Sequence, residues 1–130
     1  MKRPPIKIAH IADTHIKNLK YHDDYRACFE QMYQSLREQD VDYIVHCGDI
    51  AHTKTQISPE FVEMASNFFS SLADIATTFI ILGNHDGNLK NSSRQDAITP
   101  IIQALGREDL VLLKNAGEFE VHTGLTFNVL

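Results

Sequence analysis

The 130-residue chain has no apolar run that approaches the ~18 residues of a membrane span, so we expect no membrane association. It has only two cysteines, Cys28 and Cys47, and neither lies in a metal-binding spacing. Cys28 falls in a helical pattern and Cys47 in a strand pattern. We therefore expect both to be small buried side chains in a reducing, cytoplasmic compartment. The sequence also lacks internal repeats and low-complexity segments.

Positive charge is scarce as well. The formal net charge is −5 with histidine neutral, which excludes a basic field over the whole domain of the kind that binds nucleic acid. A nucleic-acid substrate is not thereby excluded, because bound divalent cations would reverse the local sign of charge in a carboxylate-rich site.

Strand-like and helical patterns alternate along the chain. This order predicts parallel βαβ units in an α/β fold. A short helix after Thr99-Pro100, a short strand at 110–113 and a hairpin around Thr123-Gly124 follow. The earlier strand patterns lie at 6–12, 41–47 and 77–82. The first helical pattern is capped by Asp23 or Asp24 and runs to about Gln39. The second helical pattern begins at Ser58-Pro59.

Apolar spacing within the two long helical patterns predicts which side chains are buried. The first stripe consists of Tyr25, Cys28, Phe29, Met32 and Leu36, and the second of Phe61, Ala65, Phe68, Phe69 and Leu72. Two histidines in strand patterns, His10 and His46, are predicted to pack in the core.

Three of the strand patterns end in a short polar motif. The carboxyl ends of parallel strands meet at one edge of a sheet, and that edge is where open α/β folds place their ligands. Carboxylates, imidazoles and an amide together suit a pair of divalent metal ions. The sequence therefore predicts metal-assisted attack on a phosphate ester. The motifs are Asp13-Thr14-His15, Gly48-Asp49-Ile50-Ala51-His52 and Gly83-Asn84-His85-Asp86.

Each motif offers suitable metal ligands. Asp13 and His15 are two residues apart, so in an extended segment both side chains would reach the same ion. Asp49 has two carboxylate oxygens and could bridge two ions after the sharp turn that Gly48 permits. The amide oxygen of Asn84 suits a hard cation.

One histidine of the motifs, His85, is a candidate for contact with the substrate. His85 is adjacent to Asn84, so its ring should point away from the metal, and His52 lies near the same predicted edge. Taken alone, each motif is also what a polar surface turn would contain. The metal-site interpretation depends on all three motifs lying at one edge.

In this order, the three motifs resemble those of the calcineurin-like metallophosphoesterase superfamily, and within it those of SbcD-type DNA-repair nucleases. The resemblance implies an α/β/β/α sandwich, of which residues 1–130 would be the N-terminal portion. The superfamily's later motifs, Gly-His and Gly-His-x-His, do not occur before Leu130. We therefore expect 1–130 to be part of a single nuclease domain that is truncated at its C-terminal end.

The resemblance also implies roles for individual residues. Asp13 and His15 would hold the first metal ion, Asp49 would bridge, and Asn84 would hold the second. His85 and His52 would be the catalytic residues that contact the scissile phosphate.

Cofactors and partners follow from the same resemblance. It implies two divalent metal ions, with manganese as the first choice and Mg²⁺, Fe²⁺ or Zn²⁺ as alternatives. It implies DNA as the substrate and an SMC-like ATPase subunit of the SbcC type as a partner, and it leaves a homodimer open.

The function predicted for the whole protein is two-metal hydrolysis of DNA phosphodiesters. One alternative is a metallophosphoesterase of small phosphodiesters or phosphomonoesters. A second alternative is that residues 1–130 form a folded but inactive module. A phosphoprotein phosphatase is disfavoured, because the Asp-Arg-Gly and Gly-Asn-His-Glu motifs typical of that class are missing.

Overall fold

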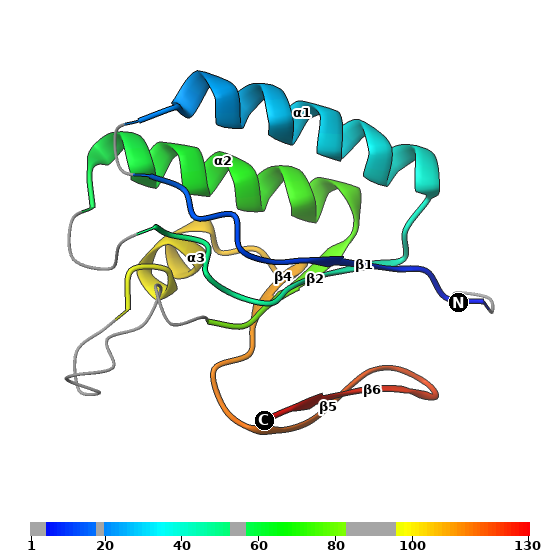
Figure 1. Cartoon of the computed structure of the whole chain (residues 1–130). Helices are drawn as coiled ribbons and strands as arrows, with labels where there is room; N and C mark the ends of the chain where they lie inside the picture. The colour runs from blue at the N-terminus through cyan, green and yellow to red at the C-terminus, as the bar shows by residue number, and fades with distance from the viewer. Residues whose placement is uncertain (1–4, 18–19, 53–56, 83–95) are drawn as a thin grey trace.

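The computed structural model describes residues 5–17, 20–52, 57–82 and 96–130. They form a four-stranded sheet in the order β1-β2-β3-β4 and a separate β5–β6 hairpin. Figure 1 shows α1 and α2 side by side over one face of the sheet and the hairpin on the other side. The elements are β1 (Ile8–Ile11), α1 (His22–Gln39), β2 (Tyr43–His46), α2 (Pro59–Ile75), β3 (Thr77–Ile80), α3 (Thr99–Leu105), β4 (Leu110–Leu112), β5 (Gly117–His122) and β6 (Leu125–Val129).

All neighbouring strands of the larger sheet are parallel, which confirms the predicted βαβ units. The register ends with Ile11 opposite His46 and His46 opposite Ile80. Because the strands run in one direction, the ends of β1, β2 and β3 lie at one edge, at the left in Figure 1. The polar loops after β1 and β2 therefore leave the sheet side by side.

Helix α2 forms as the sequence predicts. Ser58 is its N-cap and accepts a hydrogen bond from the Phe61 amide at 3.0 Å, and Pro59 occupies the first turn. These features satisfy an N–H group that would otherwise lack a partner at the helix start. All five side chains predicted for its inner face are buried.

Side chains alternate between the two faces of the sheet. Ile44, His46 and Ile80 are fully buried on the side of the helices. Tyr43 and Phe79 belong to a smaller cluster beneath the hairpin. The sheet therefore separates a large core under α1 and α2 from a small core under β5 and β6.

Helix α1 departs from the prediction in its cap and in part of its buried stripe. It begins at His22, with Tyr21 as N-cap and no side-chain cap, so Asp23 and Asp24 lie in the first turn instead of capping it. Phe29 and Leu36 are buried as predicted, and Tyr33 completes the stripe. Cys28 is exposed, because it directly precedes Phe29 in the sequence and therefore lies off the buried face of the helix.

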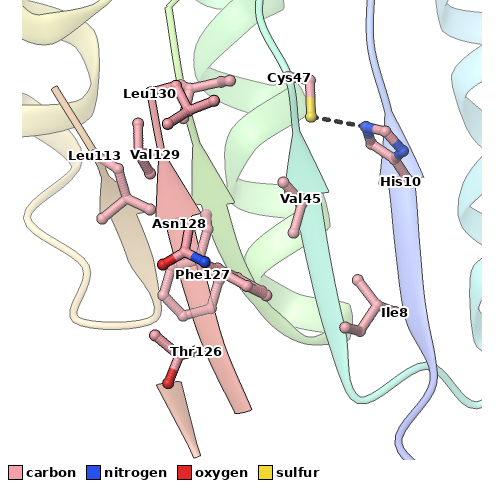
Figure 2. A pocket seen from close by; sticks show the side chains of 12 residues that line it. Ile8, His10, Val45, Cys47, Leu113, Thr126, Phe127, Asn128, Val129 and Leu130 are labelled. Atoms are coloured by element: carbon pink, nitrogen blue, oxygen red, sulfur yellow. Dashed lines mark hydrogen bonds between the residues drawn. The ribbon is translucent and has the colours of Figure 1, made fainter. Parts of the chain in front are cut away.

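The hairpin leaves an open groove of about 630 Å³ against the sheet (Figure 2). His10 lies in this groove with its Nε2 atom 2.7 Å from the Sγ atom of Cys47. The prediction that His10 packs in the core is wrong: it is exposed, because the hairpin packs on Tyr43, Phe79 and Leu113 and leaves this part of edge strand β1 open. Cys47 is half-buried instead of fully buried.

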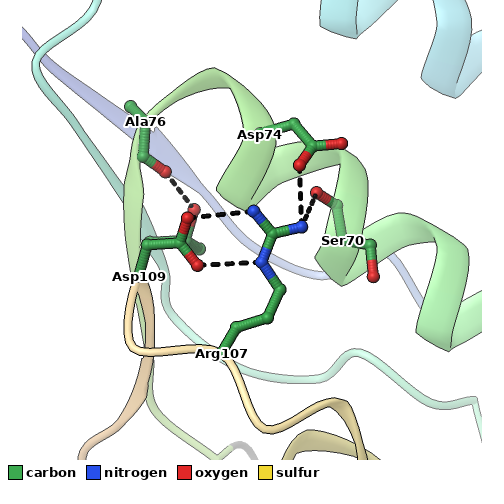
Figure 3. Close-up of polar contacts among 6 residues, drawn as sticks. Ser70, Asp74, Ala76, Arg107 and Asp109 are labelled. Atoms are coloured by element: carbon green, nitrogen blue, oxygen red, sulfur yellow. Dashed lines mark hydrogen bonds and ion pairs between the residues drawn. The ribbon is translucent and has the colours of Figure 1, made fainter.

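Arg107 joins the end of α2 to the segment before β4 (Figure 3). Its guanidinium donates to both carboxylate oxygens of Asp109 at 2.8 and 2.9 Å. It also donates to Asp74 at 2.7 Å and to the Ser70 carbonyl at 3.3 Å. A planar guanidinium suits such a two-pronged contact with a carboxylate. The network therefore holds α2 in register with the sheet.

Phe68 is the residue whose loss should damage the core most. Its ring lies 4.5 Å from that of Phe29 and 5.9 Å from that of His46, measured between ring centroids. We expect Phe68→Ala to lower the free energy of unfolding by about 3–5 kcal/mol in a urea titration, because it leaves a cavity. Val62→Ala on the same helix is the control, since Val62 is 39% exposed, and it should change stability by less than about 1 kcal/mol. Equal losses for both variants would contradict the assignment of this core.

Candidate metal centre

The loops that follow β1 and β2 are held together by backbone hydrogen bonds. The amides of one loop alternate with carbonyls of the other, so the pairing of β1 and β2 continues past the ends of the strands. An isolated parallel bridge between Ile16 and Ala51 extends it further. The bonds are Asp13 N to Gly48 O (3.0 Å), His15 N to Asp49 O (2.9 Å), Ile16 N to Ile50 O (2.7 Å) and His52 N to Ile16 O (2.9 Å).

This pairing brings Asp13, His15 and Asp49 together. One ligand atom from each lies within 4.8 Å of those of the other two. The Nε2 atom of His15 is 3.6 Å from Oδ1 of Asp13 and 3.8 Å from Oδ2 of Asp49. These separations exceed ordinary hydrogen-bond lengths. They are close to the roughly 3–3.5 Å expected between ligands that share one ion at about 2.1 Å.

The donor set also fits a divalent ion chemically. Two carboxylates and one imidazole are ligands that Mn²⁺, Fe²⁺ and Zn²⁺ accept. Asp13 is exposed, and His15 and Asp49 are half-buried, so an ion could enter from solvent. The three residues are therefore able to hold a metal ion.

Backbone strain is concentrated at the same place. Asp13, His15 and Asp49 all have left-handed conformations, with φ of 57°, 46° and 55°. Such conformations cost of order 1–3 kcal/mol each for a residue other than glycine, and they cluster at functional sites. The two side chains were expected to reach the same ion because their segment would be extended. This reason is wrong, because the backbone of Asp13 and His15 is not extended. The two side chains meet because the backbone turns at each of them.

His46 supports both loops from beneath. The Gly48 amide donates to its Nδ1 atom at 3.1 Å, so the proton of the neutral ring is on Nε2. Nε2 lies 3.4 Å from the Thr14 hydroxyl, and this hydroxyl in turn donates to the Ile50 carbonyl at 3.2 Å. The buried His46 side chain thus connects the two loops. It contacts Thr14 in the first loop and Gly48 in the second, and Thr14 in turn bonds to Ile50.

Burial lowers the pKa of His46 from 6.5 to about 4, although the carboxylates of Asp13 and Asp49 oppose the shift. The ring is therefore neutral near pH 7, as its hydrogen bonds require. Its edge also packs on the face of Phe68. The prediction that His46 packs in the core is confirmed, and its contacts add a supporting role for the two loops.

Two further contacts position the proposed ligand His15. The Tyr25 hydroxyl of α1 donates to the His15 carbonyl at 2.8 Å, which joins the first turn of the helix to the loop. The ring of His52 meets the His15 ring edge-on, with 6.1 Å between centroids. His52 is exposed. It therefore lies beside the cluster, where a bound phosphate could reach it.

The third motif lies outside the described residues. Asn84 and His85, predicted as a metal ligand and a catalytic residue, fall in the range 83–95. Their roles remain predictions. The metal roles of Asp13, His15 and Asp49 are also predictions, although the structure brings these three together.

Sequence reasoning missed the supporting residues Thr14, Tyr25 and His46. A signal was present for two of them. Thr14 stands between two proposed ligands, and His46 precedes Gly48-Asp49 by two residues. The contact of Tyr25 depends on how α1 packs, which the periodicity of the helix does not encode.

Fold and site together define an α/β scaffold with a cluster of side chains able to hold a metal ion, and comparison with known proteins identifies the family. The chain belongs to the calcineurin-like phosphoesterase family, which matches residues 6–129. Members of this family use divalent metal ions, in agreement with the donor set. The α/β fold predicted from the sequence is thereby confirmed.

Individual relatives match this chain over only a small part of their own length. The uncharacterized protein R555 of Acanthamoeba polyphaga mimivirus is 41% identical over 119 residues, which cover 88% of this chain and 9% of that protein. The DNA double-strand break repair protein Mre11 of Methanosarcina acetivorans is 32% identical over 87 residues, or 62% of this chain and 14% of that protein. The chain therefore spans only a small part of these relatives.

Among solved structures, the chain resembles the nuclease MPE of Pseudomonas putida. The TM-score is 0.55 at 20% sequence identity, and the match covers 88% of this chain and 50% of that one. This likeness supports the shared fold. None of the helices in the described ranges is long and apolar enough to cross a membrane.

The buried state of His46 predicts how stability depends on pH. Its folded pKa is below its unfolded value, so the unfolded chain binds a proton first as the pH falls. The stabilisation is complete above pH 6.5 and is lost as the pH falls toward 4, by up to about 3 kcal/mol. Urea titrations in chelator between these pH values should show this loss.

His46→Gln should have a flatter pH dependence of stability than the parent chain, because it lacks the titrating ring. Val62→Ala, at an exposed and non-titrating position of α2, is the control and should keep the parental slope. An unchanged slope in His46→Gln would show that His46 is not held neutral in the folded protein.

Proposed function

We propose that this chain is part of a phosphodiester hydrolase of the SbcD type, which cleaves DNA with two divalent metal ions. The observation that carries the proposal is the convergence of Asp13, His15 and Asp49 within a strained, hydrogen-bonded pair of loops at the sheet edge. Membership of the phosphoesterase family supports the reaction type. The names of two similar proteins, the DNA double-strand break repair protein Mre11 and the nuclease MPE, favour DNA over small phosphate esters.

Within this proposal, the ligands divide between two ions. Asp13 and His15 would hold the first ion, and the carboxylate of Asp49 would be shared between the two. Asn84 is assigned to the second ion from its motif alone. Manganese is our first choice, because the donors mix oxygen with imidazole, and Mg²⁺, Fe²⁺ and Zn²⁺ are alternatives. When bound, such ions activate water and neutralise charge on the phosphate.

The residues of the chain itself keep these ligands in place. Tyr25 fixes the backbone of His15, and His46 with Thr14 holds the two loops at a constant spacing. Preorganised ligands spend less free energy on rearrangement when an ion or a phosphate binds. His52 borders the cluster and is placed to donate to a phosphate oxygen. From its motif, His85 is assigned the role of donating a proton to the leaving oxygen.

The proposal extends to a partner. By its resemblance to SbcD-type nucleases, the whole protein would work with an SMC-like ATPase subunit of the SbcC type.

Two substitutions in the whole protein separate the proposed roles. His85→Ala should lower turnover of a DNA substrate by roughly 10²–10⁴-fold, the usual range for a general acid or base, and should leave metal content nearly unchanged. Asp49→Ala should remove metal and activity together, because its carboxylate serves both ions. Metal content by mass spectrometry and nuclease rate are measured on both variants.

Glu118→Gln is the control, since Glu118 is an exposed carboxylate of the hairpin and should change neither quantity. If His85→Ala loses metal as completely as Asp49→Ala, His85 is a ligand and the assignment of roles fails. If the unsubstituted protein turns over small phosphodiesters but no DNA, the substrate in the proposal is wrong.

A further inference from the structure

Tyr21 has an unusual environment for an aromatic residue. Its side chain is 60% exposed, and in the described part of the chain it is the only aromatic among the large exposed hydrophobic residues. Its backbone is also left-handed, with φ of 62°. A bulky residue seldom adopts this conformation without a structural or functional cause. The strain does not serve to bury the ring, which remains in solvent.

Two lysines lie near Tyr21 in the sequence, and one of them contacts its ring. The Nζ atom of Lys17 lies 5.1 Å from the centroid of the Tyr21 ring, within the range of a cation–π interaction. Lys20 is the preceding neighbour of Tyr21 and is exposed. The nearby carboxylate of Asp23 is paired with Arg26 at 3.0 Å. The first turn of α1 also carries the exposed carboxylate of Asp24, so this segment is mixed in charge, and Lys17 is the cation that lies at the ring.

Hydrogen bonds attach this group to the candidate metal centre. Lys17 follows the proposed ligand His15 by two residues, so their Cα atoms are at most ~7 Å apart. The Nε2 atom of His22 lies 2.6 Å from the Lys17 carbonyl, which joins the start of α1 to this segment. The Tyr25 hydroxyl joins the same helical turn to the His15 carbonyl. These bonds tie the first turn of α1, which begins directly after Tyr21, to the loop that carries His15.

We propose that Tyr21, Lys17 and Lys20 form a nucleotide-contacting site, in which an unpaired DNA base stacks on the Tyr21 ring and the lysines contact the adjoining phosphates. The inference rests on the proposed function, because it places this nucleotide next to the phosphate that is cleaved. Stacking of a base on an aromatic ring beside a cationic backbone contact is the general mode of single-strand binding.

The geometry selects an unpaired base. In a duplex interior both faces of a base are covered by its neighbours, so a protruding ring can stack only on a base that is terminal, unpaired or extruded. The site would therefore favour single-stranded segments and strand ends over intact duplex. It would contribute little sequence preference, because every base has a flat face.

The test measures binding without catalysis. A fluorescent oligothymidylate of about ten nucleotides is titrated with the chain in chelator at low salt, and the anisotropy is recorded. We expect Tyr21→Ala to weaken binding by at least about fivefold, the lower end for loss of one stacked base. Tyr21→Phe should bind within about twofold of the parent, because it keeps the ring. An abasic oligomer of the same length should bind more weakly and should not respond to either substitution.

A second variant gives a direct signal. The chain has no tryptophan, so Tyr21→Trp provides a single reporter whose fluorescence should be quenched by oligothymidylate and not by the abasic oligomer. Val62→Ala, on an exposed position of α2, is the control and should bind as the parent does. If Tyr21→Ala is unfolded by circular dichroism, Tyr21→Asn replaces it, because asparagine tolerates the left-handed backbone.

Several outcomes would overturn the inference. They are equal binding by Tyr21→Ala and the parent chain, equal binding of the abasic and normal oligomers, and no binding by the parent at all. Any of these would leave the contact between Lys17 and Tyr21 as a purely structural one. The proposed function fails separately, if the whole protein with Mn²⁺ cleaves no phosphodiester while the base-dependent binding in chelator is still observed.

Discussion

The hydrogen-bonded pairing of the loops after β1 and β2 is the constraint on which the rest of the site depends. Four backbone bonds of 2.7–3.0 Å continue the parallel sheet beyond its last residues. They place Asp13 and His15 opposite Asp49, although 36 positions of sequence separate Asp13 from Asp49. Without this pairing, nothing in the backbone would oppose the repulsion between the like-charged carboxylates of Asp13 and Asp49. With it, they lie at the spacing of ligands that share an ion.

The surrounding fold offsets the free energy that this arrangement requires. Three left-handed residues and two adjacent carboxylates are both unfavourable. The compensating contacts are buried: His46 bonds to Gly48 and packs on Phe68, and Phe68 is part of the core under α1 and α2. The large aromatic core thus has a direct connection to the candidate metal centre. Loss of the core should therefore loosen the loops even where no ligand is changed.

Most of the fold could be predicted from the sequence, because its signals are local. Apolar periodicity located the strands and helices, and Ser58-Pro59 located the start of α2. The convergence of Asp13, His15 and Asp49 followed from the rule that parallel strands end at one edge. What could not be predicted depends on packing between elements. The exposure of His10 follows from how far the hairpin extends over the sheet, and the left-handed turns at Asp13 and His15 follow from pairing with a distant loop.

Anomalous X-ray scattering at the manganese edge, from crystals of the chain soaked in Mn²⁺, tests the central claim most directly. The account predicts an anomalous peak within about 2.0–2.6 Å of one ligand atom each from Asp13, His15 and Asp49. It also predicts that the peak is lost in crystals of Asp49→Asn. A peak bound elsewhere, or a peak that leaves His15 and Asp49 without contact to the ion, would contradict the assignment of these loops as a metal centre.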